Sequence, residues 1–128
     1  MLNIAVFASG KGSNFRAILD AIKTGNIRNA QTVLLISNNS DAGALMIARE
    51  HHVPAVHLSR RQFGSDDAYE TALLNTLKVH DANFIALAGY MKLVPPTVVR
   101  AFKNRITNIH PALLPKFGGA GMYGMRAA

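Results

Sequence analysis

Apolar residues follow two spacings along the chain, which predict strands and helices in turn. Short segments rich in apolar residues, at 4–8, 32–36, 54–58 and 84–88, predict strands that are covered on both faces. The segments between them place apolar residues at i, i+3, i+4 and i+7, the spacing of one helix face, as in 15–22. Repeated strand–helix units of this length predict an α/β domain with a Rossmann-like, doubly wound parallel sheet.

Polar residues and prolines predict where the helices begin. Asp41 stands before one helical pattern, and Asp66 and Asp67 stand before another, so these carboxylates are expected to cap the helices. The pair Pro95-Pro96 predicts the start of a short helix, since a first turn tolerates proline. A fifth strand is expected over 105–109.

The composition is that of one globular domain. Of the 128 residues, 49% are hydrophobic and 16% are charged. None is cysteine, which excludes disulfides, thiolate metal sites and a cysteine nucleophile. We therefore expect a single domain over 1–128. The first residues form a strand pattern without the basic flank of a signal peptide, so we expect no membrane partner and a cytoplasmic protein.

The net charge of +7 is unevenly distributed. All seven acidic residues lie between Asp20 and Asp81, whereas 82–128 carries six basic residues and no acidic one. The bases are scattered, and no aromatic stacking platform lies between them, so we expect no nucleic-acid partner. The imbalance indicates instead that an acidic segment, which should complete the domain, is missing.

Two polar side chains mark the end of the fifth strand. Asn108 and His110 share one face by the period of two, and Pro111 then forces the chain out of the sheet. Ligands of open α/β sheets bind at the carboxyl ends of strands. An amide and an imidazole placed there can hold a carbonyl oxygen and move a proton. The alternative is a strand end with ordinary hydrogen bonds.

A glycine-rich segment, Ser9-Gly10-Lys11-Gly12-Ser13-Asn14, connects the first strand to the first helix. Backbone N–H groups at a helix N-terminus form an anion site, to which Ser13 and Asn14 can add side-chain donors. The segment does not fit a dinucleotide fingerprint, because Phe15 takes the place of the third glycine. Nor does it fit a Walker A loop, because Lys11 lies between the glycines. It predicts a site for a phosphate monoester or, alternatively, only a tight turn with a serine N-cap.

The histidines and the apolar residues after the fourth strand allow further interpretations. His51 and His52 are adjacent near a helix end, where the helix dipole favours histidine, so we expect no metal site. His80 ends the next helix in the same way. Met91, with its neighbour Tyr90, follows the fourth strand and is either a lid on the core or one wall of a ligand pocket.

Three stretches of the chain carry a resemblance to a known family. They are the glycine-rich segment, Leu87-Ala88-Gly89-Tyr90-Met91-Lys92, and Asn108-Ile109-His110-Pro111-Ala112-Leu113-Leu114-Pro115-Lys116. Together they closely resemble the phosphoribosylglycinamide formyltransferases, which are folate-dependent enzymes of purine biosynthesis. The likeness extends from Met1 to about Arg126. It implies the formyltransferase fold, incomplete at the C-terminus.

The resemblance implies a reaction between small-molecule substrates. A formyl group passes from the co-substrate 10-formyltetrahydrofolate to the amino group of glycinamide ribonucleotide. Asn108 and His110 match catalytic residues, and an amide with a protonated imidazole can stabilise the oxyanion that forms when the amine attacks. The other implied residues are Gly12, Ser13 and Asn14 for the ribonucleotide phosphate, Gly89 and Pro111 beside the amine, and Met91, Lys92, Leu93, Val94 and Asn108 for the folate.

The chain departs from the family pattern at two places. Asp66 stands where the family has an arginine that helps to bind the folate, so Arg60 or Arg61 would have to replace it. The third catalytic residue of the family is an aspartate in a later segment. We therefore expect the 128-residue chain to be a fragment or truncated product that is inactive alone.

Other functions fit part of the pattern. A formyltetrahydrofolate hydrolase is a close enzymatic alternative, but that family usually carries a regulatory domain before this fold. A methionyl-tRNA formyltransferase shares Leu113-Leu114-Pro115 but has a second domain. The alternative outside catalysis is a silent phosphate-binding module.

Overall fold

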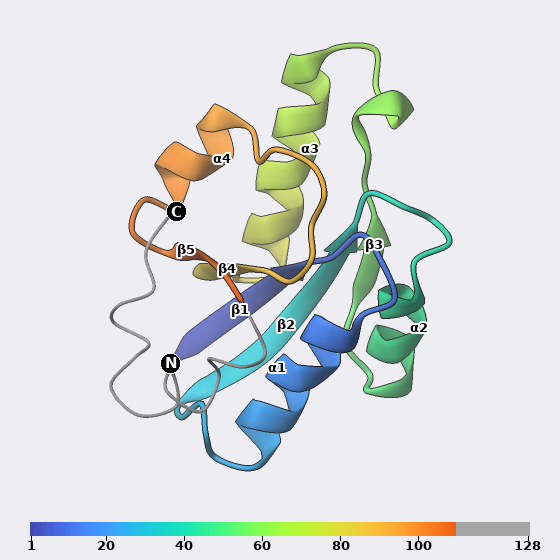
Figure 1. Ribbon diagram of the computed structural model, residues 1–128. Coiled ribbons are helices and arrows are strands. Elements are labelled where there is room, and N and C mark those ends of the chain that lie inside the picture. Colours follow the sequence, from blue (N-terminus) through green and yellow to red (C-terminus); the bar gives the residue numbers. More distant parts are fainter. Residues whose placement is uncertain (110–128) are drawn as a thin grey trace.

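A five-stranded parallel sheet forms the centre of the molecule, as the computed structural model shows for residues 1–109 (Figure 1). The strands lie in the order β3-β2-β1-β4-β5 and each is parallel to its neighbours. Their bounds are Leu2–Phe7 for β1, Ala30–Ser37 for β2, Ala55–His57 for β3, Phe84–Leu87 for β4 and Ile106–Asn108 for β5. The Rossmann-like α/β fold expected from the sequence is thus confirmed.

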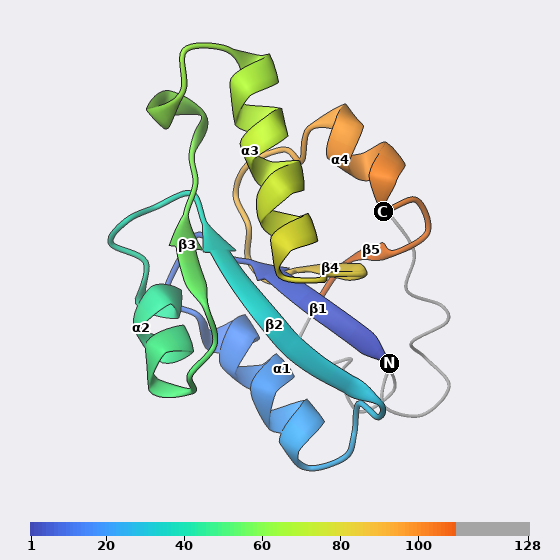
Figure 2. The same ribbon diagram turned by 180° about the vertical axis from the view of Figure 1, so that it is seen from behind.

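Helices connect the strands and cover both faces of the sheet (Figures 1 and 2). Their bounds are Ser13–Lys23 for α1, Gly43–Glu50 for α2, Asp66–Val79 for α3 and Pro96–Ala101 for α4, with a short 3₁₀ helix, η1, at Arg60–Gln62. α1 and α2 lie on one face of the sheet, whereas α3 and α4 lie on the other. The short helix predicted at Pro95-Pro96 is present as α4.

β1 separates the two halves of the hydrophobic core. Its side chains alternate between the faces, so Ile4 and Val6 pack in the layer of α1 and α2, while Ala5 and Phe7 pack in the layer of α3 and α4. All four are buried, which explains why this strand is a continuous apolar run.

The caps of α2 and α3 differ from the expectation. Ala42, not Asp41, is the N-cap of α2, and it makes no side-chain hydrogen bond. Ser65 caps α3, because its hydroxyl accepts a first-turn N–H at 3.1 Å. The capping roles predicted for Asp41, Asp66 and Asp67 are therefore wrong. Asp66 and Asp67 are the first two residues of α3, and a carboxylate in the first turn still interacts favourably with the helix dipole.

Histidines satisfy carbonyl groups at two helix ends. Nδ1 of His51 lies 2.9 Å from the carbonyl oxygen of Ile47 in α2, and Nδ1 of His80 lies 2.8 Å from that of Thr76 in α3. The helix-end interpretation is confirmed for both. Within residues 1–109, no group of three histidine or acidic side chains is placed to hold a metal ion. No helix of that range has the length and apolarity needed to cross a bilayer.

The order of the strands reverses between β1 and β4. β2 and β3 extend the sheet to one side of β1, and β4 and β5 extend it to the other. At such a switch point the connections leave the two strands in opposite directions and open a crevice where ligands bind. The glycine-rich segment follows β1 and the segment 88–95 follows β4, so both stretches meet at this crevice.

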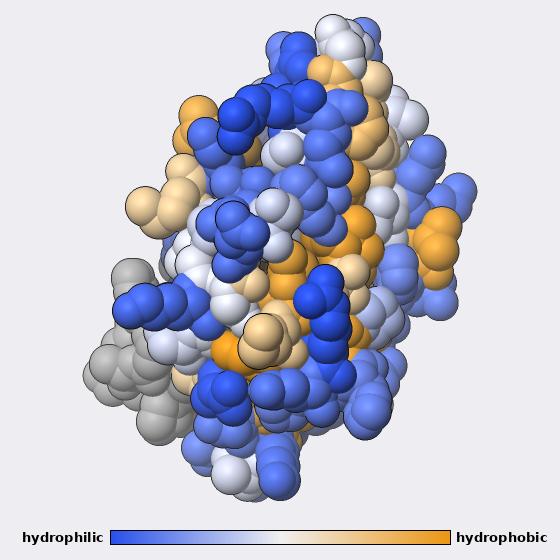
Figure 3. Space-filling view, turned by 90° about the vertical axis from the view of Figure 1, so that its right-hand side faces the viewer, coloured by the Kyte–Doolittle hydropathy of each residue, from blue (hydrophilic) through white to orange (hydrophobic). Residues whose placement is uncertain are grey.

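The surface beside β3 and α2 is mainly hydrophilic. On this side of the molecule, apolar residues form only an interrupted band between polar and charged ones (Figure 3). β3 is an edge strand of the described sheet, and a polar surface beside it is consistent with that position.

Candidate substrate-binding site

The glycine-rich segment forms a tight turn between β1 and α1. Gly12 is the N-cap of α1 and has φ of 92°, in the left-handed region, so the serine N-cap of the alternative interpretation is wrong. A methyl group added at Gly12 would lie 2.7 Å from Cδ1 of Ile47 and 2.8 Å from Cα of Ala44. Because both the backbone conformation and the contact with α2 exclude a side chain, only glycine fits this position.

Replacing Gly12 by alanine should lower the free energy of unfolding by about 2–4 kcal/mol, because left-handed strain and overpacking add. Gly10→Ala is the matched control, since its added methyl group would meet no atom within 4 Å. We expect that control to change stability by less than about 0.5 kcal/mol. Urea unfolding measures both variants. Equal losses would show that contact with α2 does not restrict Gly12.

The first turn of α1 presents unpaired donors beside this turn. The backbone N–H groups of Ser13 and Asn14 have no acceptor within the part of the chain that the structure describes. The Ser13 side chain is exposed and that of Asn14 is half-buried. A helix N-terminus favours a bound anion through its N–H groups and its dipole. The turn therefore offers backbone and side-chain donors to a phosphate.

Gly89 brings the end of β4 next to these donors. It has φ of 74°, and a methyl group added to it would lie 3.7 Å from Nδ2 of Asn14. Its carbonyl oxygen accepts the N–H of Ser9 at 3.3 Å. The predicted phosphate residues and the predicted amine-region residue Gly89 are thus neighbours at the crevice. His110 and Pro111 lie outside the described residues.

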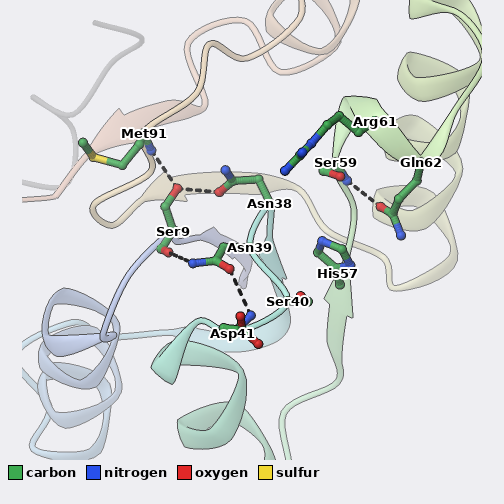
Figure 4. A pocket seen from close by; sticks show the side chains of 10 residues that line it. All are labelled: Ser9, Asn38, Asn39, Ser40, Asp41, His57, Ser59, Arg61, Gln62 and Met91. Carbon is green, nitrogen blue, oxygen red and sulfur yellow. Dashed lines mark hydrogen bonds between the residues drawn. The ribbon is translucent and has the colours of Figure 1, made fainter.

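Ser9, which follows β1, forms hydrogen bonds to residues that follow β2 and β4. Its Oγ accepts the N–H of Met91 at 2.8 Å and donates to Oδ1 of Asn38 (Figure 4). Its carbonyl oxygen accepts from Nδ2 of Asn39 at 3.3 Å. Ser9 is 8% exposed, so water competes little for these bonds. Sequence reasoning missed this role, although a serine at the carboxyl end of a buried strand was a usable signal.

Three of the cavities that residues 1–109 form lie at the carboxyl edge of the sheet. The β5 cavity, of about 310 Å³, is lined by Leu87, Tyr90, Lys92, Leu93, Val94, Val99, Ile106, Thr107 and Asn108. The α3 cavity, of about 630 Å³, is lined by Asn38, Ser59, Arg60, Arg61, Asp66, Tyr69, Glu70, Met91, Lys92, Leu93, Pro95 and Pro96. The β2–β3 cavity, of about 710 Å³, is lined by Ser9, Asn38, Asn39, Ser40, Asp41, His57, Ser59, Arg61, Gln62 and Met91. The β5 and α3 cavities share Lys92 and Leu93, and the α3 and β2–β3 cavities share four lining residues, so neighbouring cavities adjoin one another.

The β5 cavity brings together most of the residues expected to bind folate. Lys92, Leu93 and Val94 line it with Asn108, whereas Met91 lines the other two cavities. Asn108 is exposed and pairs with Leu87 at the end of the sheet. An amide at the wall of a mainly apolar cavity can bind a carbonyl oxygen or an oxyanion.

Tyr90 lies between the β5 cavity and the core. Its ring packs edge to face on Phe7, with centroids 5.2 Å apart, and its hydroxyl oxygen lies 3.3 Å from that of Tyr69. Burial raises the pKa of Tyr90 well above its ordinary value, and the hydrogen bond to Tyr69 raises it further. Tyr90 therefore stays neutral at physiological pH and does not act as a base.

An ion pair occupies the place where the resemblance implies a folate-binding arginine. Nε of Arg60 donates to Oδ1 of Asp66, and its Nη1 donates to the carbonyl oxygen of Phe63 at 2.9 Å. Arg61 forms no ion pair within residues 1–109, and it lines both the α3 and the β2–β3 cavities. Two guanidinium groups are thus present despite Asp66, and Arg61 is the one without an acidic partner in that range.

Comparisons with known proteins match the chain to formyl transferases. Residues 2–127 match the family model described as Formyl transferase. A chloroplastic phosphoribosylglycinamide formyltransferase of Arabidopsis thaliana is 43% identical over 124 residues, which cover 96% of this chain and 42% of the relative. The enzyme of the same name from Bacillus subtilis is 39% identical over 124 residues, covering 97% and 63%. The chain therefore spans only part of the length of these relatives.

Solved structures show the same similarity. A glycinamide ribonucleotide transformylase from Geobacillus kaustophilus superimposes with a TM-score of 0.79 at 44% identity, covering 91% of this chain and 62% of that one. A formyltetrahydrofolate deformylase from Pseudomonas putida has a TM-score of 0.73 at 21% identity, covering 85% and 38%. The second likeness shows a shared fold alone.

Proposed function

Because the chain belongs to the formyl transferase family, we propose that it is the substrate-binding part of a phosphoribosylglycinamide formyltransferase. In this proposal, a formyl group passes from 10-formyltetrahydrofolate to the amino group of glycinamide ribonucleotide in purine biosynthesis. The observation that carries it is the crevice between β1 and β4. There, the donors of the glycine-rich turn adjoin Gly89 on one side of β4, and the cavity with Asn108 lies on the other.

Each substrate has its own part of the crevice in this proposal. Gly12, Ser13 and Asn14 bind the ribonucleotide phosphate, which directs the amine past Gly89 and Pro111. The folate ring system lies in the β5 cavity, against Lys92, Leu93, Val94 and Asn108, and the rest of the folate follows Met91 into the α3 cavity. The two reacting groups then meet at the carboxyl ends of β4 and β5.

The proposed chemistry needs an oxyanion donor and a proton carrier. The amine nitrogen attacks the formyl carbon, and the carbonyl oxygen becomes an oxyanion that Nδ2 of Asn108 and a protonated His110 stabilise. The bond from the formyl carbon to the folate nitrogen then breaks. The proton lost by the amine is transferred to that nitrogen, through water or the imidazole of His110. The products are the formylated ribonucleotide and tetrahydrofolate.

Further features belong to the proposal. In this proposal residues 1–128 form one domain of the enzyme, and the remaining catalytic residue is the aspartate of a later segment that the resemblance implies. A cytoplasmic location is proposed from the bacterial relatives, while the plant relatives are named chloroplastic. The partners are small molecules, and no nucleic acid or membrane takes part.

Asn14→Ala should weaken binding of glycinamide ribonucleotide by about tenfold or more, because one hydrogen bond to a charged acceptor is lost. Isothermal titration of the 128-residue chain measures this directly. Asn75→Ala is the matched control, since Asn75 is exposed on α3, away from the crevice.

Glycinamide riboside, which lacks the phosphate, shows which group Asn14 binds. If Asn14 contacts the phosphate, its loss should leave riboside binding unchanged. An equal loss of affinity for ribonucleotide and riboside would refute the phosphate assignment, and no ribonucleotide binding by the unaltered chain would refute the proposed function.

A further inference from the structure

The segment 90–94, which follows β4, lines the α3 and β5 cavities but belongs to no helix or strand. Its two ends are held by apolar contacts, because Tyr90 and Val94 pack against the core on the side of α3 and α4. Between these ends, Met91 is 80% exposed and Leu93 is 93% exposed. Packing therefore restrains the middle of the segment little, and its position depends on hydrogen bonds of the backbone.

Ser9 accepts the hydrogen bond that holds the middle of this segment. The N–H of Met91 donates to Oγ of Ser9 at 2.8 Å (Figure 4). Within residues 1–109, this is the one hydrogen bond that a backbone group of 90–94 forms. Without the Ser9 hydroxyl, the Met91 N–H would have no acceptor in that part of the chain. A single side-chain oxygen thus defines where this backbone lies.

Ser9 is itself fixed by the segments that follow β2 and β4. Its N–H donates to the carbonyl oxygen of Gly89 at 3.3 Å, and its own carbonyl oxygen accepts from Nδ2 of Asn39 at 3.3 Å. Its hydroxyl hydrogen is donated to Oδ1 of Asn38. Because a hydroxyl has one hydrogen and two lone pairs, this bond directs a lone pair of Oγ to the Met91 N–H. The acceptor is therefore in place before a ligand binds.

We propose that Ser9 is a positioning residue for the formyl donor, which acts through the backbone of Met91. The inference rests on the proposed function, in which 91–94 binds the folate. Lys92 and Leu93, the next two residues, line both the α3 and the β5 cavities. A shift of the Met91 backbone would move these two side chains, so loss of the Ser9 hydroxyl should weaken folate binding.

The glycine-rich turn keeps its own contacts when this hydroxyl is lost. The carbonyl oxygen of Gly10 accepts the N–H of Ala44 in α2 at 3.2 Å, and the turn packs against α2 at Gly12. The proposed phosphate donors of the first turn of α1 thus do not depend on Oγ of Ser9. We therefore expect the loss to affect the folate and to leave the ribonucleotide bound as before.

Isothermal titration of the 128-residue chain with tetrahydrofolate and with glycinamide ribonucleotide tests this selectivity. Ser9→Ala should weaken tetrahydrofolate binding by about threefold to tenfold, the loss of one hydrogen bond, and should leave the ribonucleotide affinity within about twofold. Ser9→Thr keeps the hydroxyl and should retain both affinities. Ser37→Ala is the matched control, because Ser37 is a buried serine at the end of β2 and lines none of the three cavities.

Amide hydrogen exchange, followed by NMR without ligand, measures the hydrogen bond itself. In the parent chain, the N–H of Met91 should be protected at least about tenfold more than those of Lys92 and Leu93, which have no acceptor within residues 1–109. Ser9→Ala should remove this difference, whereas Ser37→Ala and Ser9→Thr should keep it. A change in overall stability would instead affect amides throughout the chain.

Several results would overturn the proposal. They are an equal loss of both affinities in Ser9→Ala, an unchanged folate affinity in that variant, and an equal loss of folate affinity in Ser37→Ala. An unprotected Met91 N–H in the parent chain would also overturn it, and this result does not require any variant to fold. If the parent chain binds no tetrahydrofolate, the proposed function fails and the inference with it. If the parent chain binds it and Ser9→Ala binds it equally well, the inference alone fails.

Discussion

Replacing Asn108 by alanine should lower kcat for formyl transfer by about 10²–10³, the usual loss when one oxyanion donor is removed. Asn108 lies at the end of β5, on the wall of the β5 cavity, and is exposed. The assay uses an extended chain, in which the C-terminal part of the Bacillus subtilis relative follows residues 1–128. Steady-state kinetics with 10-formyltetrahydrofolate and glycinamide ribonucleotide measure the change.

The division between kcat and KM distinguishes catalysis from binding. Affinity for the ribonucleotide should stay within about tenfold of the parent value, because the proposed phosphate site, at the glycine-rich turn, does not include Asn108. Asn75→Ala, on the exposed face of α3, should leave both parameters unchanged. An Asn108→Ala variant with near-normal kcat and a raised KM for the folate would assign this residue to binding alone.

Residues 1–128 expressed without any extension should transfer formyl groups at least about 10⁴ times more slowly than the extended chain, the loss seen where an aspartate that orients a catalytic histidine is disabled. Among residues 1–109, no aspartate or glutamate lines the β5 cavity. The family resemblance places the required aspartate in a later segment. A carboxylate beside an imidazole favours its charged form and fixes its orientation, so its loss affects both.

Single-turnover assays of the two chains at equal concentration measure this difference. Thermal unfolding of each must first show a cooperative transition, so that low activity is not caused by misfolding. Turnover by residues 1–128 alone near the ordinary enzyme rate of ~10 s⁻¹ would contradict the prediction. It would mean that a carboxylate within the chain, such as Asp41 or Asp66, serves the reaction.

The sequence predicted the strands and helices because burial produces both patterns, on two faces in the strands and on one face in the helices. β1 is apolar from Ile4 to Phe7 and β2 from Val33 to Ile36, since helices cover both sides of the sheet. Helix starts were predicted less well. Ser65 and Asp66 are both common near a helix N-terminus, and only the backbone geometry decides which of them is the cap.

In the candidate site too, some features could be predicted from the sequence and others could not. The donors of the glycine-rich turn follow from the order of strand, turn and helix. Asn108 was predicted from its place at a strand end, and Gly89 was predicted through the resemblance. The contacts of Ser9 with Asn38 and Met91 could not be predicted, because they join residues far apart in the chain. The ion pair of Arg60 with Asp66, which leaves Arg61 facing two cavities, depends equally on how η1 and α3 pack.

The choice of acceptor by the extended chain decides whether this fold serves purine biosynthesis. Formyl release from 10-formyltetrahydrofolate is measured with glycinamide ribonucleotide, with methionyl-tRNA and with water as the only acceptor. We predict transfer to glycinamide ribonucleotide alone, with loss of that transfer when Asn14 and Asn108 are both replaced by alanine. Equal formate release in the absence of the ribonucleotide, or transfer to methionyl-tRNA, would contradict the proposal and identify the chain as part of a hydrolase or of a tRNA formyltransferase.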